Sequence, residues 1–179
     1  MLRRLLLPAL LILPLLFQGA DALALSKSDR ATYLDAFALL ADGKSDEALQ
    51  RGRQAKDPLL AEVLLWRKLT RPGETVSFAD AADFLAAHPG WPGQTALRRA
   101  AEQSLPEDLP EAAVLAWFGA QPPVTAAGTL RYAKALLAAG RQTEAHDLAR
   151  TAWVERDLPR DLERDFERSF GHLLTPQDD

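Results

Sequence analysis

The chain has 179 residues, of which 47% are hydrophobic, and this is enough to build the core of one domain of ordinary size. Its 25 acidic residues outnumber its 21 basic ones, so the net charge of −4 provides no broad positive field for a nucleic acid or an anionic membrane. The absence of cysteine excludes disulfide bonds, thiolate catalysis, cysteine-ligated zinc and a lipidated cysteine. We therefore expect a fold that packing alone stabilises.

The first two dozen residues have the layout of a secretory signal peptide. Arg3 and Arg4 precede an apolar run over residues 5–17, and small residues follow this run. Two patterns of the small-x-small type are candidate cleavage sites, and they place the start of the mature chain at Leu23 or at Leu25. We favour Leu25.

A membrane anchor is the alternative interpretation of this segment. The apolar run is 13 residues long and is interrupted by Pro8 and Pro14, whereas about 20 residues are needed to span a bilayer. We therefore predict that residues 1–24 are a cleaved signal peptide. Residues 25–179 are then expected to form a domain without a stable membrane anchor, in the periplasm of a bacterium.

From Ser28 onward, the apolar residues recur at spacings of three and four, and Gly and Pro punctuate them. No stretch shows the strict alternation of a half-buried strand. The pattern predicts an all-α domain of about nine helices, with short connections that make sequential helices antiparallel neighbours. In chain order, the predicted helices cover residues 29–41, 46–55, 58–69, 78–87, 94–104, 107–117, 125–139, 142–156 and 159–170.

Helix caps explain the positions of several serines. Ser28, Ser45 and Ser77 each stand where an N-cap is expected, so we interpret them as caps rather than as nucleophiles. In the first helix, the apolar face that should be buried comprises Ala31, Leu34, Phe37, Ala38 and Ala41. The last helix is expected to bury Leu158, Leu162 and Phe166 and to present a charged face to solvent.

An internal echo indicates a repeat. Residues 39–49 match residues 136–146 in their order of helix, glycine turn and second helix, with an alanine at the tight contact between the helices. Small residues at such positions let two helices approach closely, as in tetratricopeptide-like hairpins. The echo predicts stacked helical hairpins, that is, an α-superhelix or a tetratricopeptide-like solenoid.

Residues 81–93, which read AADFLAAHPGWPG, and residues 97–102 resemble the helical N-terminal region of soluble lytic murein transglycosylases. Residues 132–140, 149–153 and 170–176 look like later repeats of the same α-superhelical domain. The resemblance covers most of the expected mature chain. It implies the scaffold of a protein that cleaves peptidoglycan glycan strands between N-acetylmuramic acid and N-acetylglucosamine without water.

In that family, the chemistry belongs to a separate lysozyme-like domain with a Glu-Ser pair and a Gly-Leu-Met-Gln segment. No glutamate of this chain is followed by serine, and its only methionine is Met1. The resemblance thus implies a scaffold that binds glycan strands weakly and cleaves nothing alone, so whether to call this chain an enzyme stays open. Thr175-Pro176 looks like the start of a further helix, and we expect the domain to be incomplete at its C-terminus.

The residues themselves predict no catalytic, cofactor-binding or metal-binding group. Glu62 lies in an apolar helix, where burial would suit a general acid, but an exposed stripe of an amphipathic helix is the favoured interpretation. His88, His146 and His172 are far apart in the sequence and lack the spacing of metal ligands, so we expect structural or solvent-facing roles.

The tryptophans could stack on sugar rings, although burial between helices is the favoured interpretation for Trp66, Trp91, Trp117 and Trp153. A second function from a different class stays open, namely a complete periplasmic tetratricopeptide-like adaptor whose concave face holds a protein partner. An enzyme active in its own right would need polar residues that converge in space, and no spacing in the sequence predicts such a cluster.

Overall fold

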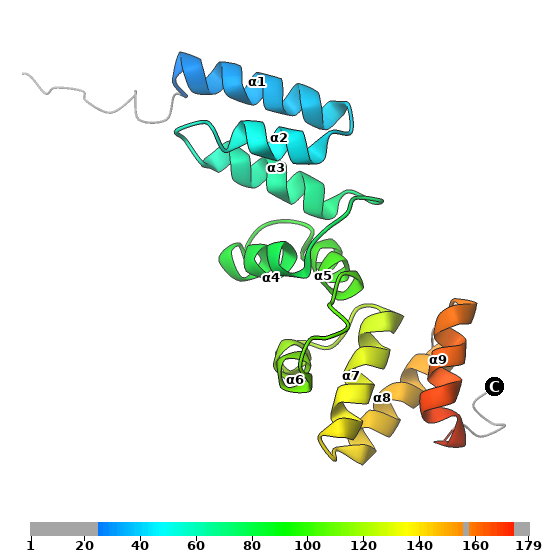
Figure 1. Ribbon diagram of the computed structural model, residues 1–179. Coiled ribbons are helices and arrows are strands. Elements are labelled where there is room, and N and C mark those ends of the chain that lie inside the picture. The colour runs from blue at the N-terminus through cyan, green and yellow to red at the C-terminus, as the bar shows by residue number, and fades with distance from the viewer. Residues whose placement is uncertain (1–24, 156–157, 174–179) are drawn as a thin grey trace, which may run out of the picture. The chain divides into compact units, whose positions relative to one another are not determined.

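In a computed structural model, residues 25–155 and 158–173 are described, and within them the chain forms nine α-helices, one 3-10 helix and no strand (Figure 1). This confirms the predicted all-α class. By its contacts the described part of the chain divides into two compact units, with the boundary between Leu60 and Ala61.

Several predictions fall on residues beyond the described part. The proposed signal peptide, residues 1–24, lies outside the described residues, and so does the Thr175-Pro176 pair. Within the described ranges, no helix combines the length and the apolar character that crossing a bilayer requires. Cleavage, export and the continuation of the domain beyond its last helix stay predictions.

The first unit is a helical hairpin of α1 (Lys27–Ala41) and α2 (Ser45–Gly52), which pack against each other. The segment after α2 is tied back to α1 by side chains. The hydroxyl of Tyr33 donates a hydrogen bond to the carbonyl of Asp57, and the N–H of Lys56 donates to Oδ1 of Asp29 at 3.0 Å. These contacts hold the turn that leads to the next helix against α1.

The buried face of α1 differs from the predicted one. The residues that were expected to be buried are exposed, with Leu34 at 67% and Phe37 at 36% exposure, and Ala31, Ala38 and Ala41 are exposed with them. The buried positions are Asp29, Thr32, Tyr33 and Ala36. Tyr33 is buried because its ring removes a large apolar area from water while its hydroxyl still donates to the carbonyl of Asp57. Asp29 can be buried because its carboxylate accepts from the N–H of Lys56.

Two of the three predicted caps are wrong by one or two residues. Ser26, not Ser28, is the N-cap of α1, and its Oγ accepts from the N–H of Asp29 at 3.0 Å. Lys44 occupies the N-cap position of α2, so Ser45 is the first residue of the helix. Ser45 is also buried. Ser77 is the N-cap of the fourth helix as predicted, and it accepts from the N–H of Asp80 at 3.0 Å.

The remaining helices lie close to their predicted positions. They are α3 (Leu59–Thr70), α4 (Phe78–Ala87), α5 (Gln94–Gln103), α6 (Glu111–Gly119), α7 (Ala126–Ala138), α8 (Gln142–Glu155), α9 (Arg160–Phe170) and the 3-10 helix η2 (Gly171–Leu173). The start of α6 was predicted at residue 107 but lies at Glu111, because Pro106 and Pro110 divert the backbone into a turn first. The second helix ends at Gly52 rather than at residue 55.

The glycine turns of the internal echo have the same stereochemistry. Gly43 and Gly140 both adopt a left-handed backbone, with φ of 80° and 76°, which glycine takes without steric cost. In each turn, the residue after the glycine closes the preceding helix through a Schellman-type bond. These bonds run from Lys44 N–H to the Leu39 carbonyl and from Arg141 N–H to the Leu136 carbonyl, both at 2.9 Å.

The alanines of the echo also behave alike. Ala48 in α2 and Ala145 in α8 are both fully buried, and each lies on the helix that follows its turn. Because alanine has only a methyl side chain, α2 can approach α1 closely, and α8 can approach α7. The predicted order of helix, glycine turn and tightly packed helix is therefore confirmed at both places.

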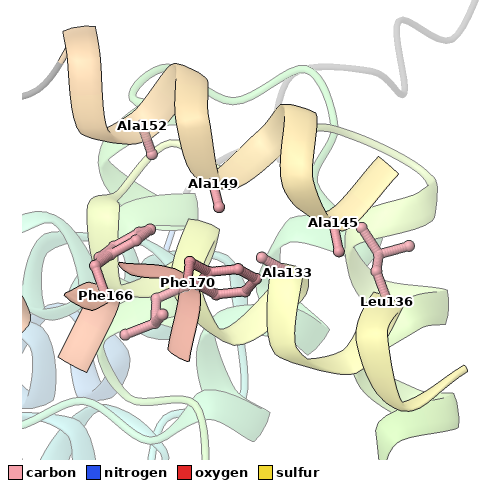
Figure 2. Close-up of a cluster of buried hydrophobic side chains, with 8 residues drawn as sticks. Ala133, Leu136, Ala145, Ala149, Ala152, Phe166 and Phe170 are labelled. Carbon is pink, nitrogen blue, oxygen red and sulfur yellow. The ribbon is translucent and has the colours of Figure 1, made fainter. Parts of the chain in front are cut away.

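The core of the last three helices is built from small residues on one helix and large residues on its neighbours (Figure 2). Ala145, Ala149 and Ala152 of α8 recur at helical spacing and face the side chains of α7 and α9. Phe166 and Phe170 of α9 fill the space that these alanines leave, and Phe170 has no exposed surface. The predicted apolar side of the last helix, with Leu158 and Leu162 packed beside Phe166, is confirmed.

Candidate functional site

One candidate site is the turn between α4 and α5, where several aromatic side chains meet. Residues 88–93 form this turn, and Gly93 takes a left-handed conformation at the N-cap of α5, with φ of 80°. The side-chain amide of Gln94 donates to the carbonyls of His88, at 3.0 Å, and Trp91, at 2.9 Å. Trp66 of α3 donates from Nε1 to the carbonyl of Pro92 at 2.9 Å. The turn is thus held from both sides.

Four ring side chains meet there, and we call Trp66, Phe84, His88 and Trp91 the aromatic turn cluster. The ring of Trp91 lies edge-on to Phe84, at a centroid distance of 5.4 Å, and edge-on to Trp66, at 6.2 Å. The imidazole of His88 lies 4.4 Å from Phe84 and 4.9 Å from Trp91. Phe84 is buried, whereas both tryptophans keep part of their surface in solvent.

Glu62 and His88 form a pair at the edge of the aromatic turn cluster. The Oε2 of Glu62 lies 3.2 Å from Nε2 of His88, and the two side chains are 41% and 23% exposed. Glu62 therefore lacks the burial on which its role as a general acid was hypothesised. The pair could not be read from the sequence, because the two residues are 26 positions apart, with Glu62 in α3 and His88 at the C-cap of α4.

The other two tryptophans also pack against apolar cores without complete burial. The ring centroids of Trp117 and Phe78 are 5.1 Å apart in a T-shaped arrangement. The guanidinium carbon of Arg98 lies over the indole of Trp117, 5.1 Å from the ring centroid. Trp153 packs against the core of α7, α8 and α9. Burial between helices was favoured for the four tryptophans. All four pack against a buried core, but each retains some exposed surface, so the predicted burial is only partial.

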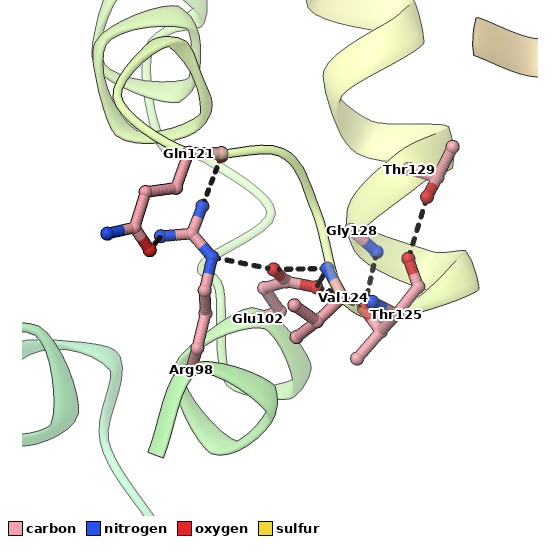
Figure 3. Close-up of polar contacts among 7 residues, drawn as sticks. All are labelled: Arg98, Glu102, Gln121, Val124, Thr125, Gly128 and Thr129. Atoms are coloured by element: carbon pink, nitrogen blue, oxygen red, sulfur yellow. Dashed lines mark hydrogen bonds and ion pairs between the residues drawn. The ribbon is translucent and has the colours of Figure 1, made fainter. Parts of the chain in front are cut away.

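The most deeply buried polar cluster joins α5 to the start of α7 (Figure 3). Glu102 is 3% exposed, and its carboxylate accepts from the backbone of Val124 and Thr125, both at 2.8 Å, and from Oγ1 of Thr125 at 2.6 Å. Thr125 is the N-cap of α7 and also accepts from the N–H of Gly128 at 2.9 Å. The carboxylate thus accepts hydrogen bonds from backbone N–H groups at the start of α7, where the helix dipole favours a negative charge.

Arg98 supplies the positive charge of this cluster. Its Nε lies 3.3 Å from Oε1 of Glu102, and its terminal nitrogens donate to the side chain of Gln121, at 3.2 Å, and to the backbone carbonyl of Gln121. Since every oxygen of Glu102 is engaged, this buried acid is not free to transfer a proton to a ligand. The cluster has the arrangement of a structural tie between α5 and α7, and its partners are too far apart in the chain to be predicted from sequence spacing.

Exposed ion pairs do not mark a site. Arg141 and Glu144, at the start of α8, form a forked pair with Nε to Oε1 at 2.7 Å, and their side chains are 45% and 57% exposed. The hydrogen bonds from Arg141 lower the pKa of Glu144 below its ordinary value of 4.5. The pair closes the first turn of its helix and contributes little in water.

Two open depressions lie in the second unit. One, of about 670 Å³, lies between the segment after α3 and the side of α5, and its acidic lining residue Glu74 is 3.7 Å from Arg71. The other, of about 510 Å³, is lined by α4, α5 and α6 and includes Arg98 and Trp117. Neither lining includes a histidine or more than one carboxylate.

His146 and His172, which are far apart in the sequence, are brought together. Their ring centroids are 6.4 Å apart, with the ring planes nearly perpendicular. Among the described residues, no group of three or more histidine, aspartate or glutamate side chains is placed to hold a metal ion. The spacing of the histidines in the sequence did not reveal this contact, because the two rings come from α8 and η2.

Comparison with models of known protein families, with curated proteins and with solved structures gave no match to the chain. The resemblance to lytic transglycosylases rests on the residues quoted above alone. Function is therefore argued from the helical architecture and from the surfaces of the described residues.

Proposed function

We propose that the chain is a non-catalytic helical scaffold of a periplasmic cell-wall protein, the scaffold part of a peptidoglycan lytic transglycosylase, and that it binds glycan strands weakly. The observation that carries the proposal is the aromatic turn cluster. Residues 81–93, which carry the resemblance, form α4 and a turn that leaves Trp91 partly exposed beside Trp66.

The chemistry of this surface suits a sugar. An indole face packs against the apolar face of a pyranose ring, and polar groups at its edge can bond to the hydroxyls of that ring. The Glu62–His88 pair provides polar groups beside Trp91, and it is partly exposed. One such surface on one turn supports weak binding, because few contacts offset the freedom that a glycan strand loses.

The scaffold character of the proposal is supported by the two matching hairpins. α1 with α2 and α7 with α8 share a glycine turn and a fully buried alanine, and a repeat of this kind is the unit of a solenoid. The stacking of all hairpins into one superhelix belongs to the proposal. So does export to the periplasm, which would depend on residues 1–24.

The absence of cleavage is proposed from the surroundings of two acids, Glu62 and Glu102. Glu62 is half-exposed beside His88, without the enclosure that tunes a general acid. Glu102 is enclosed, but backbone donors and Arg98 occupy its oxygens. In the proposal, the catalytic glutamate belongs to a separate domain.

The test uses purified, insoluble peptidoglycan and the exported form of the chain, residues 25–179. We expect part of the protein to sediment with peptidoglycan, and mass spectrometry to detect no anhydro-muropeptides after incubation. Trp91→Ala should lower the sedimented fraction at least three-fold, whereas the matched variant Trp153→Ala should leave it unchanged. Circular dichroism of both variants verifies that the helices remain.

The outcomes separate the two parts of the proposal. Release of anhydro-muropeptides by the wild-type chain would overturn the non-catalytic part, and Glu62→Gln would be the first variant to examine. Failure of the folded wild-type chain to sediment would overturn glycan binding. Equal losses in Trp91→Ala and Trp153→Ala would remove the aromatic turn cluster as the contact surface.

A protein-interaction adaptor is the second candidate, and the exposed face of α1 favours it. Leu34 and Phe37 present apolar surface to solvent on the same side as three alanines. Contiguous exposed apolar surface is typical of a protein contact. The double variant Leu34→Ser/Phe37→Ser should leave sedimentation with peptidoglycan unchanged if glycans bind the aromatic turn cluster. A loss of sedimentation in this variant, with its helicity retained, would place the contact on α1 instead.

A further inference from the structure

His146 and His172 meet because of how the end of the chain folds. His146 follows the fully buried Ala145 on α8, so its position on the helix is fixed by the packing of α8 against α7 and α9. His172 lies in η2, directly after Gly171 and next to the buried Phe170. With Ala145 and Phe170 buried beside them in the chain, the two imidazole rings lie at a centroid distance of 6.4 Å.

This distance falls within the range that one metal ion can bridge. A bond from a divalent transition metal to an imidazole nitrogen is about 2.0–2.1 Å, so two rings on one ion have centroids at most about 6.5 Å apart, and about 5.3 Å apart at a tetrahedral angle. The observed rings therefore need to approach by about 1 Å to reach tetrahedral geometry. Rotation of the exposed His172 side chain can supply this movement.

We propose that His146 and His172 form a two-histidine site for a divalent transition-metal ion of the class that prefers imidazole, namely Zn²⁺, Ni²⁺ or Cu²⁺. The chain supplies two ligands from the described residues, and water or a ligand from outside occupies the other positions. The bound ion links η2 to α8 and so fastens α9 to the core of the second unit. The inference does not depend on glycan binding.

Two features of the pair favour an ion over a purely structural ring contact. The edge-to-face arrangement has a centroid distance close to the upper end of the aromatic range, so the rings gain little from each other directly. One of the two rings is exposed and the other is partly so, which leaves a path for an ion and its waters. Two ligands make a weaker site than the four of a structural zinc centre, so we expect modest affinity.

The experiment titrates the full chain with NiCl₂ and, separately, with ZnCl₂ by isothermal titration calorimetry near neutral pH. We expect one ion per chain. His146→Gln and His172→Gln should each weaken binding at least ten-fold. His88→Gln is the matched control, because His88 lies beside Glu62 rather than beside a second imidazole, and it should leave binding unchanged.

A second readout keeps the test independent of folding defects. Saturating Ni²⁺ should raise the melting temperature of the wild-type chain and of His88→Gln, but not that of His146→Gln or His172→Gln, because an ion that binds only the folded state stabilises it. Absence of binding in the folded wild-type chain would overturn the proposal. So would equal affinities in all four proteins, or a loss in His88→Gln as large as the loss in the other two variants.

Discussion

Arg98 and Glu102 lie one turn apart on α5 and form an ion pair that is almost completely buried, with residue exposures of 7% and 3%. Pairs at this spacing are usually solvent-exposed and stabilise a single helix only slightly. Here the carboxylate also bonds to the backbone at the start of α7, so the pair joins two helices that are separated in the chain by α6.

Replacement of Glu102 by Ala should be among the most damaging single changes in the second unit. The substitution leaves the Arg98 charge buried without its partner, and it leaves the N–H groups of Val124 and Thr125 without their acceptor. Breaking a buried pair from one side costs about 3–5 kcal/mol. We expect the free energy of unfolding to fall by about that amount in a urea titration followed by circular dichroism.

Two further variants sharpen this prediction. Arg98→Met should cost less than Glu102→Ala, because the carboxylate keeps its bonds from Val124 and Thr125. Glu144→Gln removes an acid from an exposed pair and should leave the unfolding free energy nearly unchanged. If Glu102→Ala costs no more than Glu144→Gln, the buried pair is not a tie between α5 and α7.

Gly128 tests the close approach of the same cluster to α7. A Cβ at this position would collide with Oε2 of Glu102 and would lie 2.9 Å from both Cδ of Glu102 and Oγ1 of Thr125. Alanine is otherwise favoured over glycine in a helix by about 1 kcal/mol, but the collision forces these engaged groups apart. We expect Gly128→Ala to lower the unfolding free energy by about 1–3 kcal/mol, measured by urea denaturation.

Gly119 provides the matched control. It also lies in a helix, and a Cβ built on it meets no atom within 4 Å. Gly119→Ala should therefore leave stability unchanged or raise it by up to about 1 kcal/mol. If Gly128→Ala changes the unfolding free energy no more than Gly119→Ala does, the Glu102 side chain can turn away from α7 at no cost.

The helices and their turns could be predicted from the sequence because their signals are local. The glycines at 43 and 140 mark turns whose geometry only glycine adopts easily, and the alanines at 48 and 145 follow them at a fixed distance. Ser77 precedes its helix with the spacing of an N-cap, and the structure has this cap. Such patterns depend on residues within one or two helical turns.

The contacts of the candidate sites could not be predicted, because they join residues that are far apart in the chain. Glu62 meets His88 across 26 positions, and Glu102 meets Thr125 across 23. The buried face of α1 was missed for a related reason. Tyr33 is buried through a bond to the carbonyl of Asp57, which apolar spacing within α1 does not reveal. The spacing of Arg98 and Glu102 beside the buried Leu97 and Ala101 was the available hint of a buried pair.

The start of α1 offers a direct test of the corrected cap. Ser26 accepts a hydrogen bond from the N–H of Asp29 at 3.0 Å, whereas Ser28 is an exposed residue inside the first turn. Loss of an N-cap costs about 0.5–2 kcal/mol, while serine to alanine at an exposed helical position is neutral or slightly favourable. Ser26→Ala should therefore increase amide hydrogen exchange over the first turn of α1, and Ser28→Ala should not. The reverse pattern would restore Ser28 as the cap and shift the start of the helix by two residues.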